Sequence, residues 1–196
     1  MAVVAGLGKA QGKKLFAWSF SKLKGFETCP KKHFEVDIAK NFAEGKNDDP
    51  NTPLNWGNRA HAMLAAALTK TLPDPKYYVL SDEDAERIKA GVITTECKEY
   101  QSWGDRILAG PGELLVEQKY AITRDFKPAA YFGGDVWYRG IGDVVRLNGP
   151  VALVVDWKTG KVLVDSVQLM LMAQCIFSHY PEVQRVRSEF VWLKDD

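Results

Sequence analysis

The chain has 196 residues, of which 46% are hydrophobic, and its formal net charge is +1. This length and composition suit one well-buried domain, so we expect a single domain over residues 1–196. The apolar stretch before Lys13 and Lys14 has the wrong charge order for a signal peptide and is too short to cross a membrane, so we expect no membrane association. Lysines concentrate in residues 1–46, which suits either a phosphate-contacting patch or a solvated lysine-rich face.

The three cysteines, Cys29, Cys97 and Cys175, form no C-x-x-C pair. Alone they cannot complete a four-cysteine zinc or iron–sulfur site. We therefore expect a reduced protein of an intracellular compartment, the cytoplasm, including a host's cytoplasm if a phage encodes the chain.

The first part of the chain is predicted to be mainly helical. Residues 1–18 are small and rich in glycine and lysine, and we expect a flexible segment there. Ser19 or Ser21 can cap a helix that runs to about Glu27, and Pro30 suits the first turn of a second element. A loop is expected over residues 43–53. Further helices are predicted over residues 54–70 and, with a weaker pattern, 82–103.

After Gly110-Pro111-Gly112 the pattern changes from helices to strands. Strands are predicted over residues 114–122, 139–147, 151–158 and 187–194, with a helix over 166–178. The chain is therefore expected to have an α+β fold. We divide it into a helical part, 19–110, and a sheet-containing core, 111–196.

Acidic and basic side chains meet on two neighbouring predicted strands. Asn148-Gly149-Pro150 indicates an antiparallel hairpin between the strand that carries Asp143 and the strand that ends in Asp156-Trp157-Lys158. A four-residue loop would place Asp143 opposite Asp156, and a two-residue loop would place it one diagonal step away; only an odd loop or a bulge would separate them. Lys158 shares the face of Asp156 because strand side chains alternate.

Two carboxylates and a lysine are suited to metal-assisted hydrolysis of a phosphodiester. Carboxylate oxygens are hard ligands that Mg²⁺ or Mn²⁺ prefers, and such a metal activates water. The lysine can orient that water or stabilise negative charge. The alternative for this triplet is an ordinary salt bridge at the end of a sheet.

Five motifs follow one another in a characteristic order. Ser19 to Phe34 reads SFSKLKGFETCPKKHF, and Gly57 to His61 has the form Gly-x-x-x-His. Glu117 lies on the first predicted strand, Gly140-Ile141-Gly142-Asp143 precedes Asp156-Trp157-Lys158, and Gln168 opens the next helix. Together they resemble the PD-(D/E)xK nuclease superfamily, specifically its RecB-like branch, which includes AddB and RecB nuclease domains and CRISPR-associated exonucleases.

The resemblance implies a restriction-endonuclease-like core, with a central mixed sheet flanked by helices and an N-terminal helical portion. It also implies roles for individual residues. The metal ligands would be His61, Asp143 and Asp156; the catalytic residues would include Lys158 and also Glu117, which would assist the metal or its water. The DNA-binding residues would be Gln168, Ser19 and Ser21. Taken alone, His61 would more often be a core histidine than a ligand, and Glu113 competes with Glu117, which we prefer because it falls within the strand.

The chain departs from the family pattern at two places. Met172 occupies the position of the tyrosine in the Gln-x-x-x-Tyr motif, and for Met170 and Met172 we expect core packing. Cys29 occupies the place of the first cluster cysteine of iron–sulfur members, but the three later cysteines do not follow. We expect Mg²⁺ or Mn²⁺ as cofactor and no iron–sulfur cluster.

The expected function is a metal-dependent deoxyribonuclease, an exonuclease, in which water activated by the metal attacks a phosphodiester. Its partners would be single- or double-stranded DNA and a helicase or recombination protein. One alternative is a nuclease-fold subunit that binds nucleic acid with weak or no catalysis. Another is an unrelated hydrolase of small phosphoesters, although no phosphate-cradling glycine-rich loop is present.

Overall fold

The computed structural model describes residues 15–42, 49, 52–160 and 165–193. The strands are β1 (Glu113–Ile122), β2 (Tyr138–Asn148), β3 (Val151–Lys158) and β4 (Arg185–Trp192). The helices are α1 (Phe20–Thr28), α2 (Pro30–His33), α3 (Pro53–Thr69), α4 (Asp82–Lys89), α5 (Gln101–Ala109) and α6 (Val167–His179). A π-helical turn over Phe34–Ile38 follows α2, and a 3-10 segment over Thr95–Tyr100 precedes α5.

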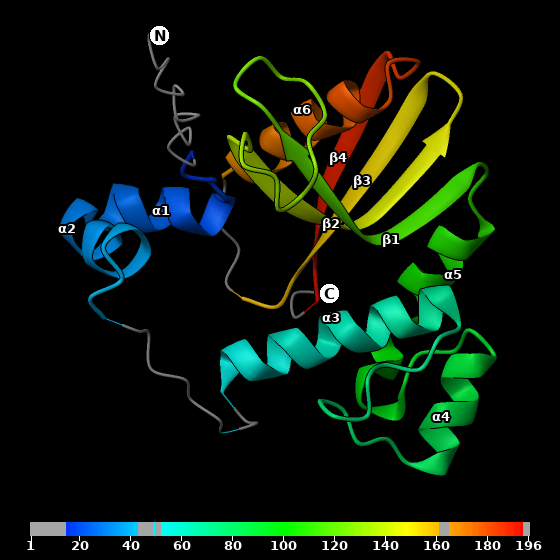
Figure 1. Ribbon diagram of the computed structural model, residues 1–196. Helices are drawn as coiled ribbons and strands as arrows, with labels where there is room; N and C mark the ends of the chain where they lie inside the picture. The colour runs from blue at the N-terminus through cyan, green and yellow to red at the C-terminus, as the bar shows by residue number, and fades with distance from the viewer. Residues whose placement is uncertain (1–14, 43–48, 50–51, 161–164, 194–196) are drawn as a thin grey trace, which may run out of the picture.

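The four strands form one mixed sheet in the order β1-β2-β3-β4. β1, β2 and β3 are antiparallel neighbours, whereas β4 runs parallel to β3 after the crossover through α6. Helix α6 covers one face of the sheet, and α3 lies on the other side together with α4 and α5 (Figure 1). This arrangement confirms the expected α+β fold with a mixed sheet flanked by helices.

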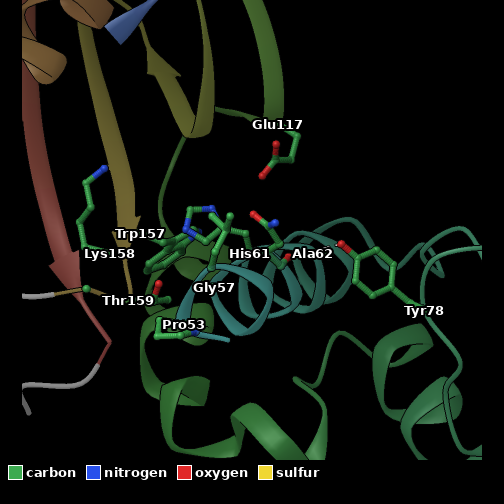
Figure 2. Close-up of a pocket in the computed structure, with 12 residues that line it drawn as sticks. Pro53, Gly57, His61, Ala62, Tyr78, Glu117, Trp157, Lys158 and Thr159 are labelled. Atoms are coloured by element: carbon green, nitrogen blue, oxygen red, sulfur yellow. Dashed lines mark hydrogen bonds between the residues drawn. The ribbon is translucent and has the colours of Figure 1, made fainter. Parts of the chain in front are cut away.

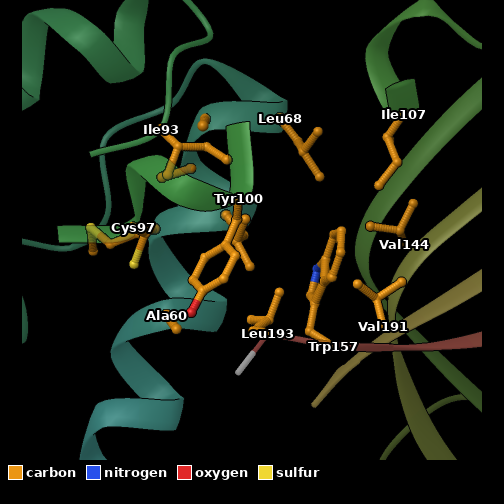
Figure 3. Close-up of a cluster of buried hydrophobic side chains, with 14 of the residues drawn as sticks. Ala60, Leu68, Ile93, Cys97, Tyr100, Ile107, Val144, Trp157, Val191 and Leu193 are labelled. Atoms are coloured by element: carbon orange, nitrogen blue, oxygen red, sulfur yellow. The ribbon is translucent and has the colours of Figure 1, made fainter. Parts of the chain in front are cut away.

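A separate hydrophobic cluster fills the space on each side of the sheet. On the α3 side, Trp157 is 2% exposed and lies between Tyr100 of the helical layer and Val144 and Val191 of the sheet (Figure 3). The cluster under α6 comprises chiefly Tyr120, Ile122, Tyr138, Val145, Ala152, Val154, Met172, Cys175 and Ile176. Because both faces of the sheet are covered, its strands carry apolar residues on both sides.

Two helix starts follow the predicted capping chemistry. The Ser19 hydroxyl accepts a hydrogen bond from the Lys22 N–H at the start of α1, and Pro30 occupies the first turn of α2. Of the segment expected to be flexible, residues 1–14 lie outside the described residues, whereas Trp18 forms a β-bridge with Tyr138. Most of the predicted 43–53 loop also lies outside the described residues.

The single helix predicted over residues 82–103 is wrong. α4 ends at Lys89, and Gly91 then adopts a φ of 79°, a left-handed conformation that ends a helix and favours glycine. The chain re-enters helix only through the 3-10 segment, and α5 continues to Ala109. The last strand was also misplaced, since β4 begins at Arg185 and ends at Trp192.

The two methionines of α6 have different environments. Met172 is 5% exposed and packs against Gly140 and Gly142, where an added Cβ would meet its side chain at 3.1 and 3.6 Å respectively. Core packing is thus confirmed for Met172. It is wrong for Met170, which is 65% exposed, because residues two apart on a helix lie on different faces.

A buried arginine joins the sheet to the end of α5. The Arg146 guanidinium donates to the carbonyl oxygens of Gly110 at 2.7 Å and Gly112 at 3.1 Å, and also to that of Ile107. These acceptors lie at the negative, C-terminal end of α5 and in the following loop, so the buried charge has strong partners. Burial lowers the pKa of Arg146.

We expect Arg146→Met to lower the free energy of unfolding by about 3 kcal/mol, because three carbonyl groups lose charged donors. Urea denaturation followed by circular dichroism measures this change. Arg187→Met is the matched control, since the Arg187 side chain is exposed and forms an ion pair with Glu189; it should change stability by less than about 0.5 kcal/mol. Equal stability of the two variants would contradict this role of Arg146.

Among the described residues, no helix is both long enough and apolar enough to cross a bilayer.

Candidate metal centre and active site

A cavity of about 690 Å³ opens between α3 and the end of β3. His61 projects into it from α3, Glu117 from β1 and Lys158 from the last position of β3. Figure 2 shows Lys158 at one side and Glu117 at the other, with His61 between them. The cavity therefore collects side chains that lie far apart in the sequence and that the motifs single out.

Three metal-binding side chains converge beside this cavity. The ligand atoms of His61, Glu117 and Asp143 all lie within 4.8 Å of one another, and the Nδ1 atom of His61 is 3.4 Å from Oδ2 of Asp143. In the part of the chain that the structure describes, no other group of three or more histidine, cysteine or acidic side chains is so arranged. Glu113, the competitor of Glu117, lies at the exposed start of β1, outside this group.

The backbone of β1 changes conformation where Glu117 projects. Glu117 has a φ of 51°, which is uncommon for a residue with a side chain and rare within a strand. Leu115 and Tyr120 are an odd number of residues apart, yet both pack in the cluster under α6. Regular alternation would place them on opposite faces, so the left-handed residue shifts the alternation of β1.

Strand β2 also shifts its side-chain alternation, at the position opposite Glu117. Val145 and Tyr138, also an odd number of residues apart, both pack under α6. The pairs Val116↔Val144 and Gln118↔Gly142 place Glu117 opposite Asp143, and neither of these two residues is paired in the ladder. Both carboxylates therefore stand at a break in the regular sheet, where His61 of α3 meets them.

The β2–β3 hairpin fixes the position of Asp143. At the turn, the ladder of paired residues continues to Asn148↔Val151, which leaves a two-residue connection. At the other end, the pair Val144↔Val155 sets the next residues, Asp143 and Asp156, opposite each other. This is the register that we associated with a four-residue loop; the connection is shorter because Asn148 and Val151 also pair. Oδ2 of Asp143 accepts a hydrogen bond from the backbone N–H of Trp157 at 2.8 Å, so β3 holds the carboxylate directly.

Asp156, Lys158 and Gln168 form a second group beside the first. Gln168, in the first turn of α6, donates to Oδ1 of Asp156 at 2.6 Å and accepts from the Lys158 ammonium at 2.8 Å. Lys158 also forms an ion pair with Oδ2 of Asp156, so the predicted shared face is confirmed. Asp156 lies outside the His61–Glu117–Asp143 group, and its role as a metal ligand stays a prediction.

Crowded negative charge alters the acid–base properties of both groups. Desolvation, followed by the charge of Asp143 and then that of Asp156, raises the pKa of Glu117 to about 7; because the side chain is exposed, solvent moderates this shift. Desolvation and Asp143 raise the pKa of Asp156 to about 6, against the opposing effect of Lys158. Burial alone would lower the pKa of His61, but Asp143, Glu117 and Asp156 outweigh it and raise that pKa.

Gly57 allows α3 to approach the end of β3. A Cβ atom added to Gly57 would lie 2.6 Å from Oγ1 of Thr159, closer than a real contact allows. His61 follows one helical turn later on the same side of α3 and reaches Asp143. The Gly-x-x-x-His spacing thus has a packing reason: the glycine brings the helix close enough for the histidine to join the carboxylates.

Ser19 and Ser21 lie apart from this cavity. They stand at the start of α1 with their hydroxyl oxygens 3.1 Å apart, and neither lines the cavity. An ion pair of 2.6 Å between Lys24 of α1 and Asp165 ties this helix to the segment before α6. The assignment of Ser19 and Ser21 to DNA binding stays a prediction.

Among the wall residues that the sequence did not indicate, Thr159 and Tyr78 carry polar side chains. Thr159 faces Gly57, and Tyr78, which precedes α4, lines the opposite side and donates a hydrogen bond to the Asn58 carbonyl at 3.4 Å. Thr159 directly follows the Asp-x-Lys motif and could have been included on that basis. Nothing in the local sequence distinguishes Tyr78, since its position depends on how the loop after α3 folds back.

The cysteines have separate environments. Cys29 caps α2, where its sulfur accepts a hydrogen bond from the Lys32 N–H at 3.4 Å. Cys97 and Cys175 are buried in the two different hydrophobic clusters. All three are free thiols.

The residues present fit a divalent cation. Two carboxylates and an imidazole supply suitable ligand atoms. Oδ2 of Asp156 is buried and, apart from the adjacent Lys158 ammonium, receives no well-directed hydrogen bond from any residue that the structure describes. Raised carboxyl pKa values are the expected result when negative charges gather without the cation that would offset them.

The mixed sheet with flanking helices and the cluster of His61, Glu117 and Asp143 are consistent with the core of a metal-dependent nuclease. Comparison with known families matches residues 17–185 to the PD-(D/E)XK nuclease superfamily. The chain therefore belongs to the PD-(D/E)XK nuclease superfamily. This membership suggests that the protein is a metal-dependent phosphodiesterase and implies a nucleic-acid substrate. No curated protein and no solved structure matches the chain significantly.

The raised carboxyl pKa values predict how metal binding depends on pH. Without metal, Glu117 and Asp156 are protonated below about pH 6, and this protonation favours the folded state because their folded pKa values exceed the usual ones. That contribution is complete below the usual carboxyl pKa values of about 4 and is lost as pH rises from there through about 6 to 7, where a divalent cation can replace the protons.

We therefore expect Mg²⁺ or Mn²⁺ to raise the melting temperature more at about pH 8 than at about pH 5.5. Thermal unfolding with metal and with chelator at both pH values measures the difference. Glu117→Gln should remove most of the pH dependence that lies above pH 6, because the residue titrates at about 7. An equal metal-induced shift at both pH values would rule out competition between protons and metal.

Proposed function

We propose that this protein is a Mg²⁺- or Mn²⁺-dependent deoxyribonuclease. The observation that carries the proposal is the convergence of His61, Glu117 and Asp143 beside a cavity that also contains Lys158. An ordinary salt bridge at the end of a sheet requires only Asp156 and Lys158. It gives no reason for an imidazole and two further carboxylates to gather within reach of one ion.

The chain's own residues have distinct tasks in this reaction. His61, Asp143 and Glu117 would hold the cation, with Asp156 at its side. When bound, a divalent cation would offset phosphate charge and lower the pKa of water. The Trp157 N–H keeps Asp143 in place, and Gln168 holds the Lys158 ammonium. From there Lys158 orients the attacking water and stabilises the negative charge that develops on the phosphate.

Within the superfamily we propose the RecB-like branch and exonuclease action on DNA. The ordered motifs from Ser19 to Gln168 support this assignment, and the packing of Gly57 against Thr159 gives the Gly-x-x-x-His motif a structural basis. We further propose that residues 1–196 act as one nuclease domain, recruited by a helicase or recombination protein.

Met172 favours a second candidate function. Its side chain is buried against Gly140 and Gly142 and so cannot supply the DNA contact expected of a tyrosine at this position. A nuclease-fold subunit that binds DNA with little or no cleavage would need that contact less. DNA affinity that falls with salt, without cleavage in any divalent metal, would select this alternative.

The decisive experiment uses end-labelled linear DNA and covalently closed circular DNA. Each is incubated with Mg²⁺, with Mn²⁺ or with chelator and analysed on a denaturing gel. Metal-dependent shortening of linear DNA from one end, with circles intact, is the expected result. Cleavage of circles would establish endonuclease action, and no cleavage with either metal would overturn the proposed nuclease.

A further inference from the structure

A cluster of aromatic rings and cations lies on the β1–β2 hairpin, outside the cavity. The rings of Tyr131 and Phe132 meet edge to face with their centres 5.0 Å apart. The guanidinium of Arg139 lies 5.2 Å from the centre of the Tyr131 ring and 5.4 Å from that of Phe132. The ammonium of Lys119 lies 5.7 Å from the Tyr131 ring. We call these four residues the aromatic–cation patch.

The patch is open and carries uncompensated positive charge. Phe132 is 73% exposed, the largest apolar exposure in the β1–β2 connection. Among the residues that the structure describes, no carboxylate forms an ion pair with Lys119 or Arg139. An exposed ring beside two unpaired cations complements a ligand that offers both a flat apolar group and negative charge.

The patch is continuous with the proposed active site. Lys119 lies two residues beyond Glu117 on β1, and Arg139 lies four residues before Asp143 on β2, which corresponds to about 7 and 13 Å along the strands. Their neighbours Tyr120 and Tyr138 pack under α6. Lys119 and Arg139 therefore project to the opposite side, on which α3 and His61 lie.

We propose that the aromatic–cation patch binds single-stranded DNA that flanks the bond to be cleaved. A base stacks on the exposed Phe132 ring, which Tyr131 supports edge to face, and backbone phosphates contact Arg139 and Lys119. A stacked strand advances about 3.4 Å per nucleotide, so the patch holds the strand about two to four nucleotides from the scissile phosphate. This inference rests on the proposed nuclease function.

The chemistry of the patch favours a single strand over a duplex. In a duplex both faces of each base are covered by neighbouring bases, so an exposed ring has no base face to stack on. In a single strand the face is free, and stacking on aromatic side chains together with cation contacts is the usual mode of binding. The hairpin thus presents the strand to the site after its bases have separated.

The test measures DNA binding without cleavage. Fluorescence anisotropy of a labelled oligothymidine and of a duplex of equal length is recorded with chelator over a range of salt concentrations. The variants are Phe132→Ala, Arg139→Gln and, as a rescue, Phe132→Trp. Phe177→Ala is the matched control, because Phe177 is an exposed aromatic residue on α6, on the other side of the sheet.

Phe132→Ala should weaken binding of the single strand at least about fivefold, with the salt dependence unchanged, and Phe132→Trp should restore it. Arg139→Gln should reduce the slope of log affinity against log salt by about 0.7, the loss of one phosphate contact. Phe177→Ala should bind as wild type. Unchanged single-strand affinity in both patch variants would overturn the proposal, as would an equal loss on the duplex.

The readout separates this proposal from the proposed function. If wild type cleaves DNA but the patch variants bind normally, only the patch proposal fails. If no metal supports cleavage but the patch variants lose single-strand binding as described, only the nuclease proposal fails.

Discussion

Asp143→Asn is expected to weaken Mg²⁺ or Mn²⁺ binding at least about 100-fold and to abolish metal-dependent cleavage. Losing a residue that merely supports a metal ligand costs 10–100-fold in affinity, so losing a ligand should cost more. The substitution removes a charge from the group in which Asp143 lies 3.4 Å from His61. It leaves an amide oxygen that can still accept the Trp157 N–H, so the hairpin should remain folded.

Metal titration by calorimetry and the metal-induced shift in melting temperature measure this loss. Glu113→Gln is the matched control, because Glu113 is an acidic residue of the same strand, β1, but lies outside the ligand group. It should bind metal and cleave DNA as wild type does. Wild-type metal affinity in Asp143→Asn would show that the three side chains are not the metal centre.

The convergence of Asp156 and Lys158 could be predicted because strand geometry is periodic. Side chains two residues apart on a strand share a face whatever the register, and the structure confirms this for the pair. Counting from the turn signal left Asp143 either opposite Asp156 or one diagonal step away, and the structure has the two opposite each other. The helix over α3 was similarly predictable, because its alanine and leucine pattern persists over several turns.

The break in the sheet could not be predicted from local sequence. Glu117 adopts a left-handed conformation without the glycine that usually indicates one, and β2 shifts its alternation at the same level. Tertiary packing on both faces of the sheet imposes this geometry. As a result, Glu117 rather than Asp156 shares the ligand group with His61 and Asp143.

Buried polar contacts were likewise hidden from the sequence. Arg146 reads as an ordinary strand arginine, but its partners are carbonyl groups at the end of a helix more than thirty residues earlier. Gln168 was expected to hold DNA near the lysine, whereas here it bridges Lys158 and Asp156. This bridge does not exclude a DNA contact, and it provides a reason for a glutamine, which both donates and accepts.

Lys158→Met is expected to lower the cleavage rate by about 10²–10⁴-fold while metal binding persists. The lysine lies beside Asp156 and Gln168 rather than in the ligand group, so its loss should affect turnover more than metal affinity. Single-turnover cleavage and metal titration on the same preparations measure the two effects. Lys89→Met, which removes an exposed lysine paired with Glu86, is the control and should leave both unchanged.

A double variant distinguishes catalysis from a structural ion pair. Removing Lys158 alone leaves Asp156 buried without its cationic partner, so Lys158→Met should also lose stability. Adding Asp156→Asn neutralises that carboxylate, and we expect stability to recover while cleavage stays at least as slow as in Lys158→Met. If the pair served only to hold the sheet end together, the stable double variant would cleave DNA, and the proposed role of Lys158 would be wrong.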